Sequence, residues 1–146
     1  MGPGLIPIGA RVYCDSSIFI YAIEQHIEFG VPASTVIDRG SSKEIELVSS
    51  ELAIMESMVR PLRANDTEIV RDFDLLFGVR WLEFVAIDRT LLRAAAALRA
   101  RHPSLRTPDA IHLATANQSA IDVFLTNDRM LATICGSRAK LLSDFR

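Results

Sequence analysis

The sequence has few of the residues that build disulfide frameworks or zinc sites. Its 146 residues include two cysteines, Cys14 and Cys135, and three histidines. The cysteines lie far apart in apolar stretches, and the chain contains no paired cysteine motif. These features exclude a disulfide-rich domain and a cysteine-based zinc site. We expect both thiols to be reduced residues of the core.

An excess of positive charge and a long hydrophobic run are also missing. Lysine and arginine total 16 against 18 acidic residues, and the resulting net charge of −2 argues against a globally basic nucleic-acid binder. A local basic patch is still compatible with these numbers. No apolar stretch approaches the roughly 20 residues that cross a bilayer, and residues 1–8 lack the basic start of a signal peptide. We therefore expect a cytoplasmic protein with no membrane partner.

Strand-like and helix-like segments alternate over the whole chain. The hydrophobic fraction of 49% is typical of a globular protein, and 146 residues suit one domain. Strands are predicted at 11–14, 46–49, 82–87, 122–126 and 140–142, and helices at 16–23, 32–39, 51–63, 66–77, 91–101, 108–117 and 129–134. Suitable N-caps are Ser16 or Ser17, Asn65, Asp88 and Thr107, and Gly40 and Gly78 are suitable helix ends. The alternation predicts a single-domain α/β/α sandwich with a mostly parallel central sheet.

Four acidic residues from distant segments are expected at one edge of this sheet. Asp15 and Asp128 follow predicted strands, Asp109 opens a helix, and Glu56 lies within another helix. Ligands of open α/β sheets bind beyond the carboxyl ends of the strands, so the four carboxylates could line one pocket. Oxygen-only ligands favour Mg²⁺ or Mn²⁺, and bound Mg²⁺ usually retains water and substrate phosphate. The pattern therefore indicates metal-dependent phosphoryl-transfer chemistry.

Each acid also has a purely local explanation. Asp15 could cap the following helix, and Asp109 could interact with the dipole of its own helix. Residues 126–128 could form a simple turn. If each acid had only a local role, it would be improbable for all four to lie at the same sheet edge. The coincidence favours a shared site. Without a metal ion, we expect the clustered carboxylates to raise one another's pKa.

Glu56 is predicted at the border of the buried face of its helix. In this prediction the buried face consists of Leu52, Met55, Val59 and Leu62, and Met58 is also a core residue. A carboxylate at that border costs free energy unless it is paired or bound to a cation. The alternatives are a solvated edge position or an ion pair with Arg60, one turn further along the helix.

Other residues could support the same site. His112 follows Asp109 by three positions, and a core or supporting role is expected for it rather than a role as metal ligand. Arg129, Arg60 and Arg63 are candidate phosphate contacts. Arg129 is the best placed because it directly follows Asp128.

Four segments together resemble the signature blocks of PIN-domain ribonucleases. They are Val12–Ser17 before an apolar helix, Ser50–Leu52 with Glu56, Thr107–Ala114, and Leu125–Asp128. The likeness extends from about Val12 to the C-terminus, and the small chain is most similar to the VapC toxins of toxin-antitoxin pairs. On this resemblance, residues 1–146 form a single PIN-like domain in which residues 1–10 are an N-terminal extension.

The resemblance implies a Mg²⁺- or Mn²⁺-dependent endoribonuclease that cleaves structured RNA, such as tRNA or rRNA, with a metal-activated water. It further implies a homodimer and a cognate antitoxin protein that inhibits the enzyme. By matching positions, the metal site would consist of Asp15, Glu56, Asp109 and Asp128, supported by Ser16, Thr126 and Asn127.

Other functional classes fit the motifs less well. A metal-dependent adhesion module begins with Asp-x-Ser-x-Ser, but this chain has Phe19 at the last position. A haloacid-type phosphatase requires a second aspartate where this chain has Ser17. Two alternatives close to the resemblance stay open: an RNA-processing nuclease outside a toxin system, and a catalytically silent PIN domain that acts as a binding module.

Overall fold

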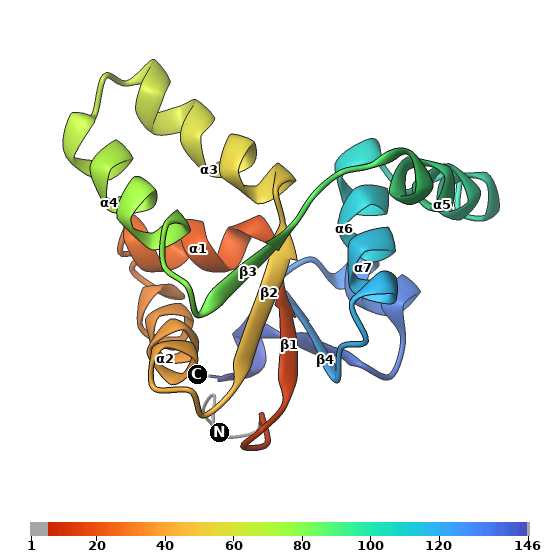
Figure 1. Cartoon of the computed structure of the whole chain (residues 1–146), viewed down its shortest axis with the longest axis horizontal. Coiled ribbons are helices and arrows are strands. Elements are labelled where there is room, and N and C mark those ends of the chain that lie inside the picture. The colour runs from red at the N-terminus through yellow and green to blue at the C-terminus, as the bar shows by residue number, and fades with distance from the viewer. Residues whose placement is uncertain (1–5, 146) are drawn as a thin grey trace.

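The computed structural model describes residues 6–145, which contain a five-stranded parallel sheet (Figure 1). The strands are β1 (Arg11–Cys14), β2 (Glu46–Ser50), β3 (Leu82–Val85), β4 (Val123–Thr126) and β5 (Ala139–Leu141). They lie in the order β3-β2-β1-β4-β5, and each neighbouring pair is parallel. All five strands were predicted, and the structure confirms the predicted sheet.

Helices cover both faces of the sheet, which confirms the α/β/α sandwich (Figure 1). One face packs against α1 (Ser16–Ile23), α2 (Gly30–Ser41), α3 (Leu52–Arg63), α4 (Thr67–Phe77) and the 3₁₀ helix η2 (Leu142–Phe145). The other face packs against α5 (Arg89–Arg101), α6 (Thr107–Gln118) and α7 (Arg129–Cys135). Within the described residues, no helix has the length and apolar character needed to span a membrane.

Strands β1 and β4 are apolar on both faces because helices cover both faces of the sheet. Along β1, Val12 and Cys14 pack toward α1 and α2, whereas Tyr13 packs toward α6. Phe124 of β4 is the parallel partner of Tyr13, and the two rings stack with their centroids 5.1 Å apart. Continuous apolar runs are typical of strands buried in this way. The first polar residue after each strand is therefore the one that emerges at the carboxyl edge.

Helices α4 and α6 begin at residues other than the predicted N-caps. Asp66 caps α4 by accepting a hydrogen bond from the amide of Ile69, whereas Asn65 has a positive φ of 53°. Asparagine tolerates the left-handed conformation, which lets the chain turn immediately before the cap. Helix α6 includes Thr107 as its first residue, and Arg106 precedes it without a side-chain capping bond.

The buried face of α3 also differs from the predicted one. Its buried residues are Leu52, Ala53, Ser57 and Pro61. Leu52 is buried as predicted, but the other three residues of the predicted face lie on the outside, where Met55 is 60%, Val59 45% and Leu62 58% exposed. Met58 packs partly against the core. Small residues at four-residue spacing form the inner stripe, so α3 approaches its neighbours through that stripe and leaves the larger apolar residues outside.

The described part of the predicted N-terminal extension packs on the domain. Ile6 is fully buried, and its carbonyl accepts a 2.8 Å hydrogen bond from Arg39 Nη2 of α2. The amide of Gly9 donates to the carbonyl of Glu44, just before β2, at 2.7 Å. Residues 1–5 of the extension lie outside the described residues.

Gly40 was predicted to end a helix, but α2 continues through it to Ser41. A Cβ atom at position 40 would lie 2.5 Å from Leu47 Cδ1 and 2.7 Å from Leu47 Cγ. Leu47 belongs to β2 and is itself buried. The glycine therefore permits close packing of α2 on the sheet.

We expect Gly40→Ala to destabilise the fold by about 1–3 kcal/mol, the usual cost of overpacking a core. Gly78→Ala is the matched control, because a Cβ there would lie 3.4 Å from its nearest neighbour, the Asp74 carbonyl oxygen. Urea unfolding of both variants measures the difference. Equal stability of the Gly40→Ala variant and the control would show that the contact between α2 and β2 is not tight.

Candidate active site

A pocket of about 300 Å³ opens at the carboxyl ends of β1 and β4. The connections from these neighbouring strands run to opposite faces of the sheet, which makes their junction a topological switch point. The pocket is lined by Asp15, Ser16, Ser17, Tyr21, Glu56, Asp109, His112, Asn127, Asp128 and Leu131. All four predicted acidic residues therefore line one pocket, although they come from four separate segments.

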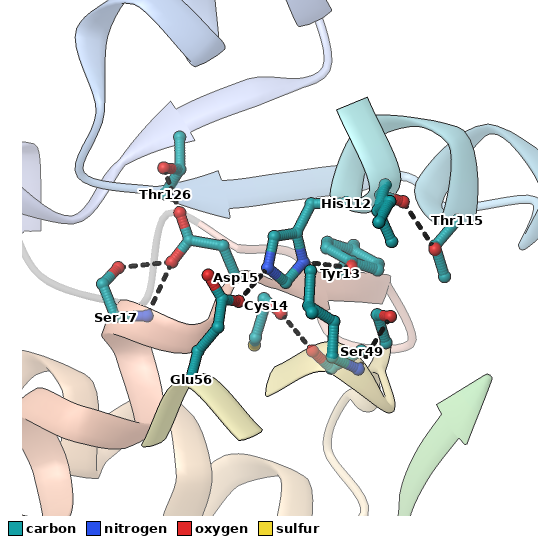
Figure 2. Close-up of polar contacts among 12 residues, drawn as sticks. Tyr13, Cys14, Asp15, Ser17, Ser49, Glu56, His112, Thr115 and Thr126 are labelled. Carbon is teal, nitrogen blue, oxygen red and sulfur yellow. Dashed lines mark hydrogen bonds and ion pairs between the residues drawn. The ribbon is translucent and has the colours of Figure 1, made fainter. Parts of the chain in front are cut away.

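Asp15 is held by hydrogen bonds on both of its carboxylate oxygens (Figure 2). Oδ1 accepts from the Ser17 amide at 3.0 Å and from the Ser17 hydroxyl, and Oδ2 accepts from the Thr126 hydroxyl. Asp15 is thus the N-cap of α1, rather than Ser16 or Ser17 as predicted. The capping role and the place in the pocket occur together, so the local explanation does not exclude a function.

The pKa of Asp15 is raised above its ordinary value, mainly because burial penalises the charged carboxylate. The hydrogen bonds from Ser17 and Thr126, and the electrostatic effect of His112, lower the pKa in part. We predicted an upward shift caused by neighbouring carboxylates. The direction is confirmed for Asp15, but the main cause is burial.

Glu56 reaches the pocket from α3 and pairs with His112 (Figure 2). Its Oε1 lies 2.6 Å from His112 Nε2, so its observed partner is this imidazole rather than the alternative partner Arg60. The His112 side chain is 3% exposed and that of Glu56 26% exposed. The expectation that His112 has a supporting position agrees with this contact.

Asp109 lies in the first turn of α6 with one oxygen left unsatisfied. Its Oδ2 is buried and has no hydrogen-bond partner within residues 6–145. Arg106 Nε lies 3.7 Å away, but the Arg106 side chain is 80% exposed. An exposed pair at this distance contributes little. A buried carboxylate oxygen without a partner is suited to accept a cation or a proton.

Asp128 and Asp15 are connected through Thr126. The amide of Asp128 donates to Thr126 Oγ1 at 3.0 Å, while the Thr126 hydroxyl donates to Asp15. The Asp128 side chain also caps α7 through the amide of Leu131. Thr126 is fully buried, so it fixes the relative position of the chain ends of β1 and β4.

The other predicted supporting residues have different surroundings. Asn127 lines the pocket, and its Oδ1 accepts a 3.1 Å hydrogen bond from the Ser143 amide of η2. Ser16 lines the pocket, but Ser17 makes the direct contacts with Asp15. Sequence reasoning missed this role of Ser17, which follows from its position two residues after the N-cap. Tyr21 was also missed, since only the completed first turns of α1 bring it to the pocket.

The three predicted arginines do not line the pocket. Arg60 and Arg63 lie in the last turns of α3, and Arg129 opens α7; all three are exposed. Their proposed contacts with RNA phosphates stay predictions. The two cysteines are free thiols whose pKa is raised by burial, so neither is an activated nucleophile.

The residues of the pocket fit a hard divalent cation. The donors are carboxylate and hydroxyl oxygens, and Asp109 Oδ2 is a buried acceptor without a partner. Within residues 6–145, no three His, Cys, Asp or Glu side chains are close enough to hold a metal ion by themselves. Mg²⁺ suits such an arrangement because it usually binds one or two carboxylates and keeps several waters.

The fold and sequence place this pocket in a known family. Residues 12–136 match the PIN domain, and the chain belongs to the PIN domain family. The fold is similar to that of VapBC2 from Rickettsia felis, solved bound to a DNA fragment from its promoter. The TM-score is 0.69 with 14% identity, over 90% of this chain and 98% of that one. It is also similar to a toxin-antitoxin complex from Klebsiella pneumoniae, with a TM-score of 0.59 and 21% identity over 80% of this chain and 86% of that one. No curated protein matches the chain.

We expect the stability of the metal-free protein to fall, relative to an Asp15→Asn variant, as pH rises above the ordinary range for aspartate. Burial raises the pKa of Asp15 in the folded state, so within this window the folded protein binds more protons than the unfolded chain. Stability then decreases with rising pH, and asparagine removes that titration. Urea unfolding in EDTA at several pH values measures the difference. Parallel pH profiles for the two proteins would contradict this account of Asp15.

Proposed function

We propose that this protein is a Mg²⁺- or Mn²⁺-dependent endoribonuclease, the toxin of a VapBC-type pair, that cleaves structured RNA such as tRNA or rRNA. The carrying observation is the convergence of Asp15, Glu56, Asp109 and Asp128 on one pocket at the switch point of a PIN fold. PIN domains are nucleases that generally use divalent metal ions. The specific ion and the RNA substrate are parts of the proposal.

In this proposal the four carboxylates would hold the cation, directly or through waters that it keeps. A bound Mg²⁺ or Mn²⁺ lowers the pKa of water and stabilises charge on the phosphoryl oxygens. Ser17 and Thr126 fix both oxygens of Asp15, so this side chain would bind the cation without changing its orientation. Asp109 Oδ2, which has no hydrogen-bond partner among the described residues, would be free to bind the cation or to take up a proton.

A protein partner is the second part of the proposal. Of the two structures named above, one is VapBC2 with promoter DNA and the other is a toxin-antitoxin complex. On this chain, Met55, Val59 and Leu62 form an exposed apolar stripe along α3, the helix that carries Glu56. Exposed apolar stripes of this kind often mark contacts with other proteins. The homodimer and the cytoplasmic location stay predictions, as does the alternative of an RNA-processing nuclease outside a toxin pair.

The test is cleavage of structured RNA by purified, antitoxin-free protein. Cleavage should require Mg²⁺ or Mn²⁺ and stop on addition of EDTA. Asp15→Asn should abolish cleavage and remove most of the thermal stabilisation by Mn²⁺, because asparagine keeps the cap but loses the charge. Asp66→Asn makes the same change at the N-cap of α4 and should leave both readouts intact. Undiminished cleavage in EDTA, or by the Asp15→Asn variant, would refute the mechanism.

A second experiment addresses how RNA is held near an acidic pocket. Because the four carboxylates repel phosphates, we expect arginines outside the pocket to supply attraction, with Arg129 as the first candidate. Arg129→Gln should make the slope of log affinity against log salt shallower by about 0.7, the value for one lost contact with single-stranded nucleic acid. Arg71→Gln on α4 is the control. An unchanged slope for Arg129→Gln would remove Arg129 from the RNA contacts.

A further inference from the structure

Hydrogen bonds connect the protein interior to the pocket through three residues (Figure 2). Tyr13 Oη lies 2.6 Å from His112 Nδ1, and His112 Nε2 lies 2.6 Å from Glu56 Oε1. The three residues belong to β1, α6 and α3. This line of contacts therefore joins the centre of the sheet to the helix that carries Glu56.

The inner two residues are held in place by packing. Tyr13 is fully buried, and its ring stacks on Phe124 with the planes 10° apart. The same ring meets His112 edge-on at a centroid distance of 5.8 Å. Close-packed interiors leave little room for such rings to rearrange. His112 therefore presents Nε2 toward Glu56 in a defined direction.

The contacts also select one tautomer of His112. An ionised Glu56 only accepts hydrogen bonds, so Nε2 must carry a proton. In the neutral ring, Nδ1 then accepts from the hydroxyl of Tyr13. Burial, and to a smaller extent the charge of Asp15, raises the pKa of Tyr13 well above its ordinary value, so its hydroxyl remains a donor. Each donor along the line has an acceptor.

Glu56 depends on such a partner more than the other acids do. Asp15 and Asp128 are N-caps, and Asp109 lies in a first helical turn, where backbone amides stabilise negative charge. Glu56 lies further into α3, beyond those terminal amides. Ordering a flexible glutamate side chain costs conformational entropy. A donor on a buried ring offsets part of that cost and selects one orientation of the carboxylate.

We propose that Tyr13 and His112 are positioning residues that hold the Glu56 carboxylate in the orientation that binds Mg²⁺ or Mn²⁺. The inference rests on the proposed function, in which Glu56 is a metal ligand. His112 acts through Glu56, and Tyr13 acts through His112. Groups that orient metal ligands typically change metal affinity 10- to 100-fold when they are replaced. A purely structural pair would change stability instead.

Two substitutions of His112 separate these roles. Glutamine places its amide nitrogen near the position of Nε2 and can still donate to Glu56. Asparagine is shorter, so it can accept from Tyr13 at the position of Nδ1 but does not reach Glu56. Both variants put an amide in the same buried place. Their unfolding in EDTA should therefore be similar, whereas their metal binding should differ.

The measurement is Mn²⁺ binding without RNA, followed by the electron paramagnetic resonance signal of free Mn²⁺. We expect His112→Asn to weaken binding by about 10-fold or more, and His112→Gln by less than about 3-fold. Tyr13→Phe, which keeps the packed ring, should weaken binding measurably. The same substitution should add nothing in the His112→Asn background, where the contact with Glu56 is already lost.

Several outcomes would overturn the proposal. Wild-type Mn²⁺ affinity in a folded His112→Asn variant is one, and equal weakening in His112→Asn and His112→Gln is another. If His112→Asn does not fold, unchanged affinity in Tyr13→Phe overturns it. If the variants differ in Mn²⁺ affinity as expected but the wild-type protein cleaves no RNA, the positioning role is supported and the proposed activity is refuted. A wild type that binds no Mn²⁺ would refute both.

Discussion

The pocket depends on the parallel pairing of β1 with both β2 and β4. Parallel strands end at the same edge of the sheet, so the residues that follow β1 and β4 emerge side by side even though about 110 positions separate them. The bond from Thr126 to Asp15 spans this junction. Since the helices after the two strands cover opposite faces, the space between their first turns remains available for a ligand.

Most of the fold follows from local features of the sequence. Apolar runs of four or five residues ending in a polar residue predict the buried strands, and β1 and β4 end at or within one residue of the predicted positions. The same reasoning predicts that Asp15 and Asp128 lie at this sheet edge, because a residue that directly follows a buried strand has little freedom in where it emerges. Asp109 follows from the Thr107-Pro108 helix start. These predictions succeed because each depends on only a few neighbouring residues.

Features that depend on contacts between elements were less predictable. The period of α3 fits two neighbouring stripes, and hydrophobicity favours the stripe with Met55 and Val59, whereas packing buries the small residues Ala53 and Ser57. Close approach between helices is a property of two surfaces, and one sequence segment does not reveal it. The same limit applies to Gly40, because the side chain that requires a glycine there is Leu47 on β2. Glu56 was nevertheless predicted at the border of the buried face, because it borders both stripes.

The four acids are stabilised in two different ways. Asp15, Asp109 and Asp128 lie at helix starts, where backbone amides favour a negative charge and, for Asp15, offset part of the cost of burial, so capping and ligand roles are compatible. Glu56 lies beyond the first turn of α3, at the border of the exposed apolar stripe. Its charge is instead supported by His112 and, behind it, Tyr13. A buried polar pair is costly in a core unless every donor and acceptor is used. Because Glu56 lines the pocket, the buried pair of His112 and Tyr13 supports the pocket as well as the packing of the core.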